Sequence, residues 1–445
     1  MADNVPFRPD DCLSRARKVE VSLPEIRAHD MPSTAAPAQA RSDTTRAMFA
    51  RIFLPFAAGY FLSYLYRSVN ALIGGDLARD LDLGASELGL LTAAYFFAFG
   101  AFQLPLGLLL DRYPPARINA ALLVFAGAGA ALFALAQDVA GLTLGRALIG
   151  LGVSACLMSA MKAFVLWFPM DRLASLNGWM LASGGLGAMT ASAPVEAMLE
   201  ITGWRGVFFI LSAASFAAAA AVLLVVPGRK AEGEPETLAR MIAGYARIFS
   251  SARFWRIALV AMTVQAGFLA VQGLWVGAWF ADVGGLARAA LSMRLLALAV
   301  ATTVGFAFFG WFSDRLATRG VPPLTVFKIG ALLAAAALAV IAFVPALAGL
   351  AAWLVFNLFS ASAPIGYAIL SREFPRELAG RVNTAVNLLI FAAAFSIQWG
   401  LGAIVGLWEK IAGHYPPAAY AAALGALLVL QVVALAGVAT LRSRV

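Results

Sequence analysis

The chain has 445 residues, of which 62% are hydrophobic and 13% charged, and its mean hydropathy is +0.83. Soluble domains carry roughly 25% charged residues, so this composition excludes a soluble enzyme, a disordered scaffold and a disulfide-rich secreted module. The formal charge of +9 does not indicate nucleic-acid binding, because the basic residues recur in short segments between apolar stretches. The sequence therefore predicts a polytopic membrane protein.

The sequence offers little for metal binding or catalysis. Cys12 and Cys156 lie in a polar tail and in an apolar segment, so no disulfide framework is expected. His29 and His414 lack metal-ligand spacing. We find no set of nucleophile, base and orienting group, and no phosphate loop of a primary pump. We expect no enzymatic activity, cofactor, metal or nucleic-acid partner.

Residues 1–47 are polar and lack the apolar core of a signal peptide, so we interpret them as a disordered cytoplasmic tail. Met31 and Met48 leave open a later start of translation. From Met48 onward, apolar stretches recur that are long enough to cross a bilayer as helices. An all-α protein is expected, with twelve transmembrane helices near 50–74, 86–110, 118–137, 141–168, 175–197, 206–226, 257–281, 289–312, 323–345, 347–370, 384–408 and 418–441.

The connectors between the predicted spans differ in charge. One set carries most of the arginines, whereas the other holds little beyond Arg79, Arg205, Arg288 and Lys410. Because positively charged loops stay in the cytoplasm, both termini and residues 227–255 are predicted to be cytoplasmic. The expected location is a bacterial-type inner (plasma) membrane.

The spans form two similar halves. GLLLDR at residues 107–112 is echoed by GWFSDR at 310–315, and FPMDR at 168–172 by FPRE at 374–377, at nearly the same offset. Such parallel repeats are typical of a carrier whose site lies between the halves. The predicted organisation is a tail at 1–47, a six-helix bundle at 48–226, a cytoplasmic linker at 227–255, a second bundle at 256–441 and a cytoplasmic C-terminus at 442–445.

These motifs resemble those of the major facilitator superfamily of secondary transporters, over essentially all of residues 48–441. The echoed loop resembles the superfamily's motif between spans two and three. Arg146-x-x-x-Gly150-x-Gly152 resembles its second signature, and Gly203-Trp204-Arg205 its usual entry to span six. The resemblance implies two pseudo-symmetric six-helix bundles that move a small solute across the membrane by alternating access, in a protein that we expect to be monomeric.

The echoed loop is predicted to act as a conformational latch, the alternative being a merely solvated turn. Glycine lets two helices approach closely, and aspartate–arginine pairs can form in one conformation and break in the other. The predicted latch residues are Gly107, Asp111, Arg112, Arg117, Gly310, Asp314, Arg315 and Arg319.

Four ionisable residues inside the predicted spans are functional candidates, because charges within a membrane are costly. Arg67 and Arg146 lie at similar estimated depths of roughly 12–13 Å, at 1.5 Å per residue, and could face one cavity. Lys162 could snorkel or pair with backbone carbonyls, and Arg294 is predicted to be an interface anchor. Because no carboxylate is expected at this depth, the substrate is predicted to be a small organic or inorganic anion.

Arg67 is the preferred anion anchor, with Arg146 in support, although the latter is structural in many superfamily members. Helical spacing adds tyrosines that share a face with Arg67. It also places Gln265, Gln272 and Trp279 on one face of span seven. The predicted substrate-binding residues are Arg67, Arg146, Tyr60, Tyr64, Gln265, Gln272, Asn357 and Asn387.

The stretch Tyr66–Asn70 resembles span one of the organic-anion branch, the anion:cation symporters, and Gln272–Trp275 resembles bacterial members grouped with nitrate/nitrite carriers. The acids usual in the first branch are replaced by Tyr66 and Val153, which argues against simple proton symport. Two alternatives stay open. One is a proton-coupled multidrug or metabolite efflux antiporter, and the other is a transporter-like sensor that binds ligand without net flux.

Overall fold

The computed structural model describes residues 38–169, 172–229, 238–375 and 378–441. Residues 48–445 form one compact unit, and the description concerns that unit. Of the preceding unit, the described part is the beginning of the first helix, which starts at Ala38 inside the stretch predicted as a tail. Residues 1–37 of that tail, 230–237 of the predicted linker and 442–445 of the predicted C-terminus lie outside the described residues.

The described chain is almost entirely helical, with one isolated bridge between Ile411 and His414 as its extended pairing. The helices of the first half are α1 (Ala38–Ser68), α2 (Asn70–Asp80), α3 (Ala85–Ala101), α4 (Gln103–Arg112), α5 (Pro115–Leu135), α6 (Val139–Val153), α7 (Cys156–Trp167), α8 (Leu173–Thr190) and α9 (Ala193–Val225). Those that follow are α10 (Leu238–Phe249), α11 (Ala252–Ala270), α12 (Val276–Asp282), α13 (Arg288–Ala317), α14 (Pro323–Phe343), α15 (Leu350–Ser360), α16 (Ile365–Glu373), α17 (Ala379–Val405) and α18 (Pro417–Ala439).

In the described residues, eleven helical segments are long and apolar enough to cross a membrane. The predicted span at 175–197 is not a separate member of that set, because α8 is rich in glycine and polar residues and continues past a break at Ala191–Ser192 into α9. Gly203, at φ 64° and ψ 177°, then turns the chain within α9. Residues 193–202 therefore complete the fifth pass and 204–225 form the sixth, which accounts for the twelve predicted spans.

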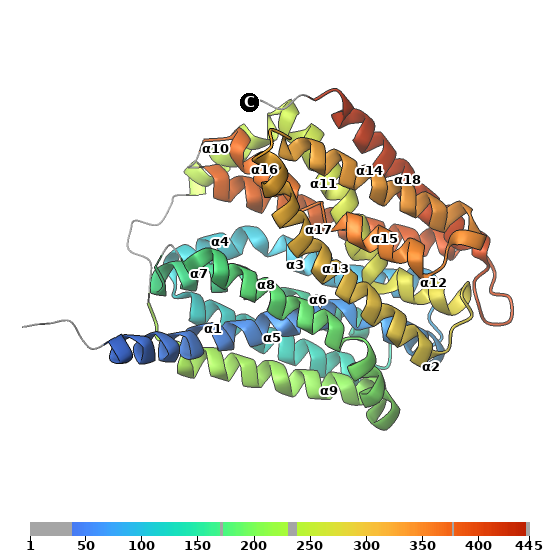
Figure 1. Cartoon of the computed structure of the whole chain (residues 1–445). Helices are drawn as coiled ribbons and strands as arrows, with labels where there is room; N and C mark the ends of the chain where they lie inside the picture. The colour runs from blue at the N-terminus through green and yellow to red at the C-terminus, as the bar shows by residue number, and fades with distance from the viewer. Residues whose placement is uncertain (1–37, 170–171, 230–237, 376–377, 442–445) are drawn as a thin grey trace, which may run out of the picture. The chain divides into compact units, whose positions relative to one another are not determined.

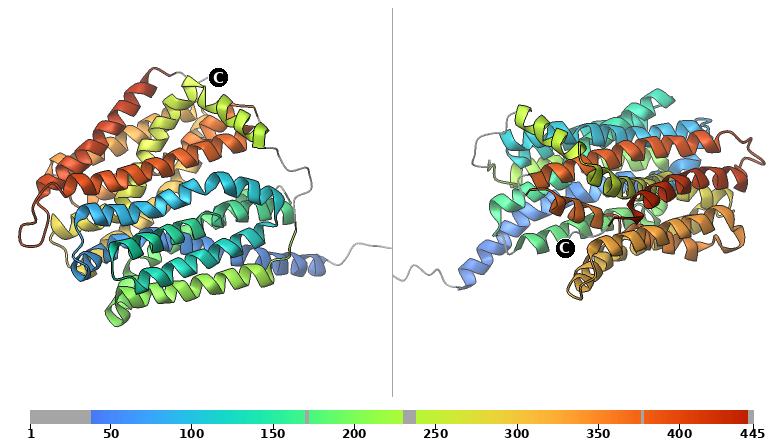
Figure 2. Two further views of the ribbon diagram at one scale, coloured as in Figure 1. Left: turned by 180° about the vertical axis from the view of Figure 1, so that it is seen from behind. Right: turned by 90° about the horizontal axis from the view of Figure 1, so that it is seen from above.

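The two halves lie side by side. The helices of the first half, blue to green, occupy one side of the unit, and those of the second half, yellow to red, occupy the other (Figures 1 and 2). Within the first half α5 packs against α6 and α9, and within the second α14 packs against α15 and α18. Between the halves, α3 packs against α17 and α8 against α13.

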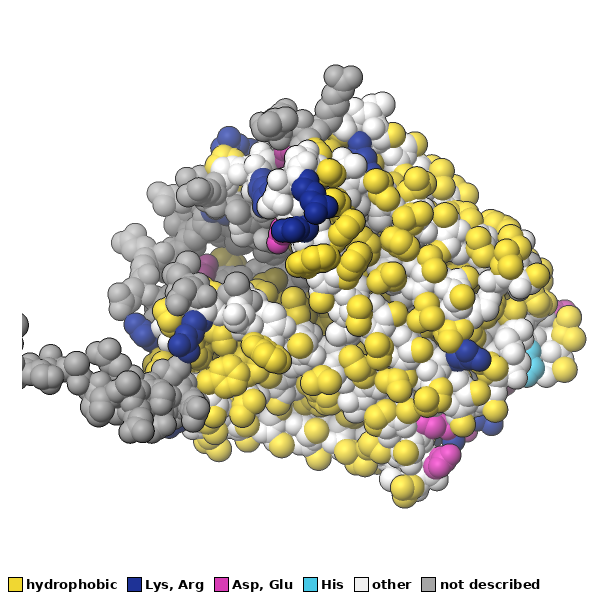
Figure 3. All heavy atoms as spheres, viewed as in Figure 1, with side chains coloured by type: hydrophobic (Ala, Val, Ile, Leu, Met, Phe, Trp, Pro, Cys, Tyr) yellow, Lys and Arg dark blue, Asp and Glu magenta, His cyan; other side chains and the backbone are white. Residues whose placement is uncertain are grey.

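The surface carries a broad hydrophobic face with charged side chains toward its ends (Figure 3). Large apolar side chains are exposed, such as Leu224 at 80% and Val433 at 67%. A soluble protein rarely exposes so large an apolar area, whereas lipid tails accept it. The composition, the long apolar helices and this surface together establish a multi-pass, all-α membrane protein.

Local sequence sets where several helices begin and break. Pro115, Pro323 and Pro417 open α5, α14 and α18, at the position where a missing N–H costs nothing. Several predicted spans are not continuous helices. In the first span α1 ends at Ser68 before α2 begins, and in the seventh a π-helical turn at Val271–Trp275 separates α11 from α12. Such irregular turns inside helices frequently mark functional sites.

The two halves touch backbone to backbone where α2 meets α12. A Cβ atom placed on Gly277 would lie 1.8 Å from the carbonyl oxygen of Ala71. Only glycine therefore permits this approach, and the contact joins the second part of the first pass to the end of the seventh.

We expect Gly277→Ala to destabilise the protein by about 1–3 kcal/mol, the usual cost of overpacking, because a backbone atom cannot move aside as a side chain can. The measurement is the thermal unfolding midpoint of the purified protein in detergent. Gly437→Ala in α18 is the matched control, since a Cβ there meets nothing within 4 Å. Equal midpoints for the two variants would show that the contact is not tight.

Candidate functional site

A cavity of about 800 Å³ lies between the two halves. At one end its lining includes the exposed Asp314 and Arg372, near the last turns of α13 and α16, and we call this the open end. At the other end the lining stops at Ala71, Ser192 and Leu295. We call the part of the molecule beyond these three residues the closed end.

Arg67 lines the cavity and is framed by aromatic rings. Its guanidinium carbon lies 4.8 Å from the ring centre of Tyr64, 5.4 Å from that of Phe99, 5.6 Å from that of Phe391 and 6.0 Å from that of Tyr95. Its Nε atom is buried without a hydrogen-bond partner, and no carboxylate among the described residues pairs with it. Aromatic faces stabilise a cation, and the Tyr95 side chain also hydrogen-bonds the guanidinium. The Nε–H group is left without a partner, and an anion can supply one.

Arg146 does not line the cavity, although it was predicted to support the anion. It is 1% exposed, donates from Nη1 to the carbonyl oxygen of Tyr66 at 3.0 Å and lies 5.1 Å from the ring centre of Tyr95. The Arg67 guanidinium lies 6.0 Å from the centre of the same ring, so both arginines are near Tyr95, but only Arg67 lines the cavity. In this conformation Arg146 holds the end of α1, where the helix breaks.

Five other predicted residues do line the cavity: Tyr60, Tyr64, Gln265, Gln272 and Asn387. The two tyrosine rings pack edge to face, with centres 5.1 Å apart. The Oε1 atoms of both glutamines are buried without a hydrogen-bond partner. Asn387 accepts a hydrogen bond of 3.1 Å from the hydroxyl of Tyr367, a second lining residue.

Two other polar or aromatic candidates lie elsewhere. Asn357 is fully buried; it donates to the carbonyl of Trp353 at 2.8 Å and accepts from Thr302 at 3.1 Å, so it ties helices together rather than facing the cavity. Trp279 packs on Trp353 instead of sharing the face of Gln272. The π-helical turn between these two positions of span seven changes the helical register, which breaks the seven-residue spacing.

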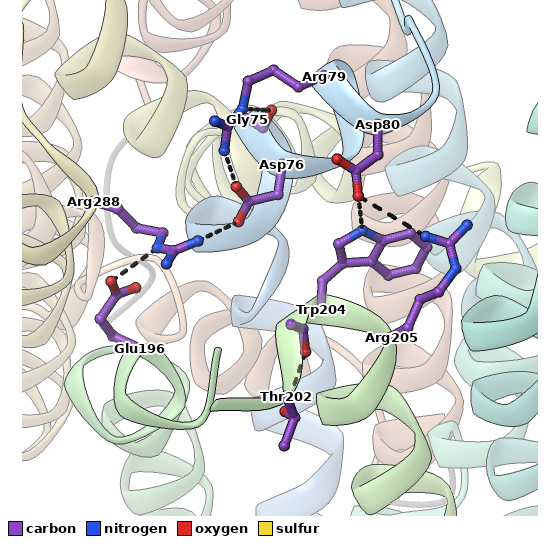
Figure 4. Close-up of polar contacts among 10 residues, drawn as sticks. Gly75, Asp76, Arg79, Asp80, Glu196, Thr202, Trp204, Arg205 and Arg288 are labelled. Atoms are coloured by element: carbon purple, nitrogen blue, oxygen red, sulfur yellow. Dashed lines mark hydrogen bonds and ion pairs between the residues drawn. The ribbon is translucent and has the colours of Figure 1, made fainter. Parts of the chain in front are cut away.

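The closed end is held by an ion-pair cluster that crosses the halves (Figure 4). Arg288, the first residue of α13, binds Glu196 of α9 through Nε at 2.9 Å and Asp76 of α2 through Nη1 at 3.0 Å. Asp76 also pairs with Arg79 within α2. Both carboxylates are nearly buried, whereas the arginine is about a third exposed, at 36%. One side chain of the second half thus bridges two acids of the first.

A second contact at this end uses the Gly203-Trp204-Arg205 motif. The indole Nε1 of Trp204 donates to Asp80 at 2.8 Å, and the guanidinium of Arg205 lies 4.1 Å from the Trp204 ring centre (Figure 4). This contact fastens the start of the sixth pass to the end of α2. Its role is therefore to position α2, which carries Asp76.

The predicted latch residues lie at the open end and do not form the expected aspartate–arginine pairs. Asp111 pairs with Lys162 at 2.5 Å, and not with an arginine. No ion pair joins Asp314, Arg112, Arg117, Arg315 or Arg319 to another described residue. A Cβ on Gly107 or Gly310 would meet nothing within 4 Å, so these glycines do not bring helices together here, contrary to expectation. The reason is that the cavity is open at this end; the latch itself stays a prediction.

Lys162 and Arg294 differ from the anion-binding candidates. The ion pair with Asp111 replaces the snorkelling or carbonyl contact expected for Lys162. Neither Lys162 nor Arg294 lines the cavity. Of the four intramembrane cations, Arg67 is therefore the one that a solute in this cavity would meet.

Sequence reasoning missed two features of the site. The aromatic frame had a signal in Tyr95-Phe96-Phe97-Ala-Phe99 of span two, a run unusually dense in rings. The sequence signal for the closed-end cluster was the pair Glu196 and Arg288, which are opposite charges at span ends predicted to lie on the same side of the membrane. Their pairing could not be derived, because a single sequence does not show which spans are neighbours.

We expect Arg288→Ala to open the closed end, because Asp76 and Glu196 would then lose their shared cation. A partly exposed ion pair stabilises the closed state by about 1 kcal/mol. Its loss should therefore raise the population in which the two halves are separated at this end about fivefold. Spin labels on Ile201→Cys and Leu407→Cys, both highly exposed at this end, report that population as long distances in pulsed electron resonance.

Arg79→Ala is the control for this measurement, since it removes a cation from Asp76 without removing a contact between the halves. Its distance distribution should match that of the parent. A distribution for Arg288→Ala that also matches the parent would show that the ion pairs do not hold this end together.

Comparisons with known proteins agree with this architecture. A family model described as Major Facilitator Superfamily matches residues 56–398. The probable sulfoacetate transporter SauU of Cupriavidus necator is 28% identical over 157 residues, covering 35% of this chain and 36% of that protein. The hexuronate transporter of Escherichia coli is 27% identical over 223 residues, covering 45% of this chain and 50% of that protein. The matched regions thus span half or less of these relatives.

Among solved structures, the fold is similar to that of a bacterial homolog of the human lysosomal transporter Spinster, in an inward-facing and occupied conformation. The TM-score is 0.72 at 17% identity, over 88% of this chain and 96% of that one. At this identity the likeness shows the fold alone.

Proposed function

Because the chain belongs to the major facilitator superfamily, we propose that it is a secondary carrier of a small anion, with Arg67 as the anchor that the anion binds. The carrier would work by alternating access, with the cavity exposed to one side of the membrane at a time. The observation that supports this proposal most strongly is a lining guanidinium with an unpartnered Nε and no carboxylate beside it.

The chemistry of the cavity favours an anion over a cation. A buried cation without a counter-ion is costly, and a bound carboxylate, sulfonate or phosphate would supply the missing partner through paired hydrogen bonds. Gln265 and Gln272 can donate from their amide nitrogens to the same solute. The relatives named as sulfoacetate and hexuronate transporters would both carry anions, which is consistent with this proposal.

The structure would represent one of the two access states. Its open end carries the arginine-rich segments that are predicted to be cytoplasmic, so the cavity would face the cytoplasm of a bacterial-type cell. The ion pairs of Arg288 would close the opposite side. Exchange of these contacts for latch contacts at the open end would give the other state.

A thermal-shift screen of the purified protein tests the anion-carrier proposal. We expect the monovalent anions lactate or galacturonate to raise the unfolding midpoint, because a ligand that binds the folded state stabilises it, by about 2.7 kcal/mol at a hundredfold excess over Kd. Arg67→Gln should lose this stabilisation. Neutral sugars and hydrophobic cations should leave the midpoint of the parent unchanged.

Arg146→Gln is the matched control, because this second buried arginine does not line the cavity. Its midpoint without ligand should fall, but the anion should still raise it. Stabilisation by hydrophobic cations that persists in Arg67→Gln would contradict the proposal and would support a drug-efflux function instead.

A further inference from the structure

We propose that the carrier is an obligatory exchanger of monovalent anions, in which the return of the empty carrier is blocked by the charge of Arg67. This inference rests on the proposed function and names its substrate charge and its mode of transport. It follows from the charged groups of the cavity, their pairing and their position along it.

Five charged side chains line the cavity in the described residues. Four of them, Arg253, Asp314, Arg372 and Glu373, lie at the open end. Arg253 and Glu373 form an ion pair with an Nε–Oε2 distance of 2.7 Å and a second bond of 2.8 Å. The fifth is Arg67, deeper in the cavity and one residue before the break between α1 and α2. The deep part of the cavity thus carries a single positive charge.

A single positive charge selects a single negative charge. A monovalent anion on Arg67 leaves the deep cavity neutral, whereas a divalent anion leaves one negative charge unpaired in an enclosed, mostly apolar space. Arg146 cannot neutralise this second charge, because it does not line the cavity and its Nη1 donates to a carbonyl. Unpaired charge in such surroundings is strongly unfavourable.

The same charge controls the empty carrier. To pass to the other access state, the halves must close over Arg67 and remove the water that now enters from the open end. With an anion bound, a neutral pair is enclosed; without one, a bare guanidinium is enclosed, at the cost of its lost hydration. The aromatic frame covers the faces of the guanidinium and supplies one hydrogen bond from the Tyr95 side chain, but it leaves the Nε–H group without a partner. The loaded carrier therefore crosses, and the empty one does not.

A bound proton cannot take the place of the anion. The titratable groups that face the deep cavity are Arg67 itself and the phenols of Tyr60, Tyr64 and Tyr367. An arginine stays protonated, and a neutral phenol does not ionise near neutral pH. The carboxylates that could carry a proton, those of Asp314 and Glu373, stand at the open end, away from the anchor. Transport should therefore not be driven by a proton gradient.

The test uses the full-length protein in liposomes, with labelled galacturonate or lactate as monovalent probes and sulfoacetate as a divalent probe. We expect uptake of a monovalent probe into vesicles preloaded with the same anion to exceed uptake into anion-free vesicles about tenfold, as unfavourable enclosure of a bare charge requires. The exchange should be unchanged by an imposed membrane potential or pH gradient, since one negative charge replaces another. Arg67→Gln should abolish it and Arg67→Lys should retain a measurable part.

The outcomes separate the two proposals. If none of the three probes shows uptake that depends on Arg67, the anion-carrier function falls, and the exchange inference with it. If a probe is carried, the function stands, and the inference is overturned by equal uptake into empty vesicles, by uptake driven by a pH gradient, or by exchange of sulfoacetate as fast as that of the monovalent probes.

A second measurement does not depend on transport. Spin labels on Tyr113→Cys and Thr318→Cys, exposed residues at the ends of α4 and α13, report whether the open end closes. In the ligand-free parent we expect long distances only; the anion, or the neutral substitution Arg67→Gln without anion, should add short ones. Short distances already present in the ligand-free parent would overturn the inference, because the empty carrier would then close freely.

Discussion

A positive charge enclosed in a membrane protein without an acid beside it is the constraint around which the other parts of this structure are arranged. Arg67 is kept in place by the faces of four aromatic rings rather than by a carboxylate. The acids are placed instead at the ends of the spans, where Asp76 and Glu196 of the first half both pair with Arg288 of the second. The protein thereby separates the charges that hold it closed from the charge that meets the solute.

The sequence predicts the architecture well because its signals are physical and local. Long apolar stretches, their spacing and the duplicated loop motif sufficed for twelve passes in two halves. What it could not predict were departures from regular helices. The π-helical turn at Val271–Trp275 brings Gln272 to the cavity but turns Trp279 away, and no residue pattern announced it. Ideal helical spacing fails wherever one extra residue is inserted into a turn.

The candidate site was predicted less completely, for a different reason. Depth in the membrane can be counted along a helix, so Arg67 and Arg146 were both found, but direction around the helix depends on neighbouring helices. Arg146 meets the ring of Tyr95 and a carbonyl of α1, and it is buried behind the cavity wall. Asn357 likewise makes its hydrogen bonds inside the bundle, with Thr302 of α13 and with the carbonyl of Trp353 in its own helix. Buried polar residues are more often held by such internal partners than by a solute.

The break between α1 and α2 connects the anchor and the ion pairs of the closed end mechanically. Arg67 is the next-to-last residue of α1, and Asp76, whose carboxylate meets Arg288, lies on α2 just beyond the break. Trp204 restrains the far end of that short helix through Asp80. A displacement of Arg67 is therefore transmitted along about two helical turns of α2 to Asp76, whose ion pair with Arg288 holds the closed end together. Solute binding at Arg67 and opening of the closed end are thus coupled through α2 alone, without a chain of further contacts.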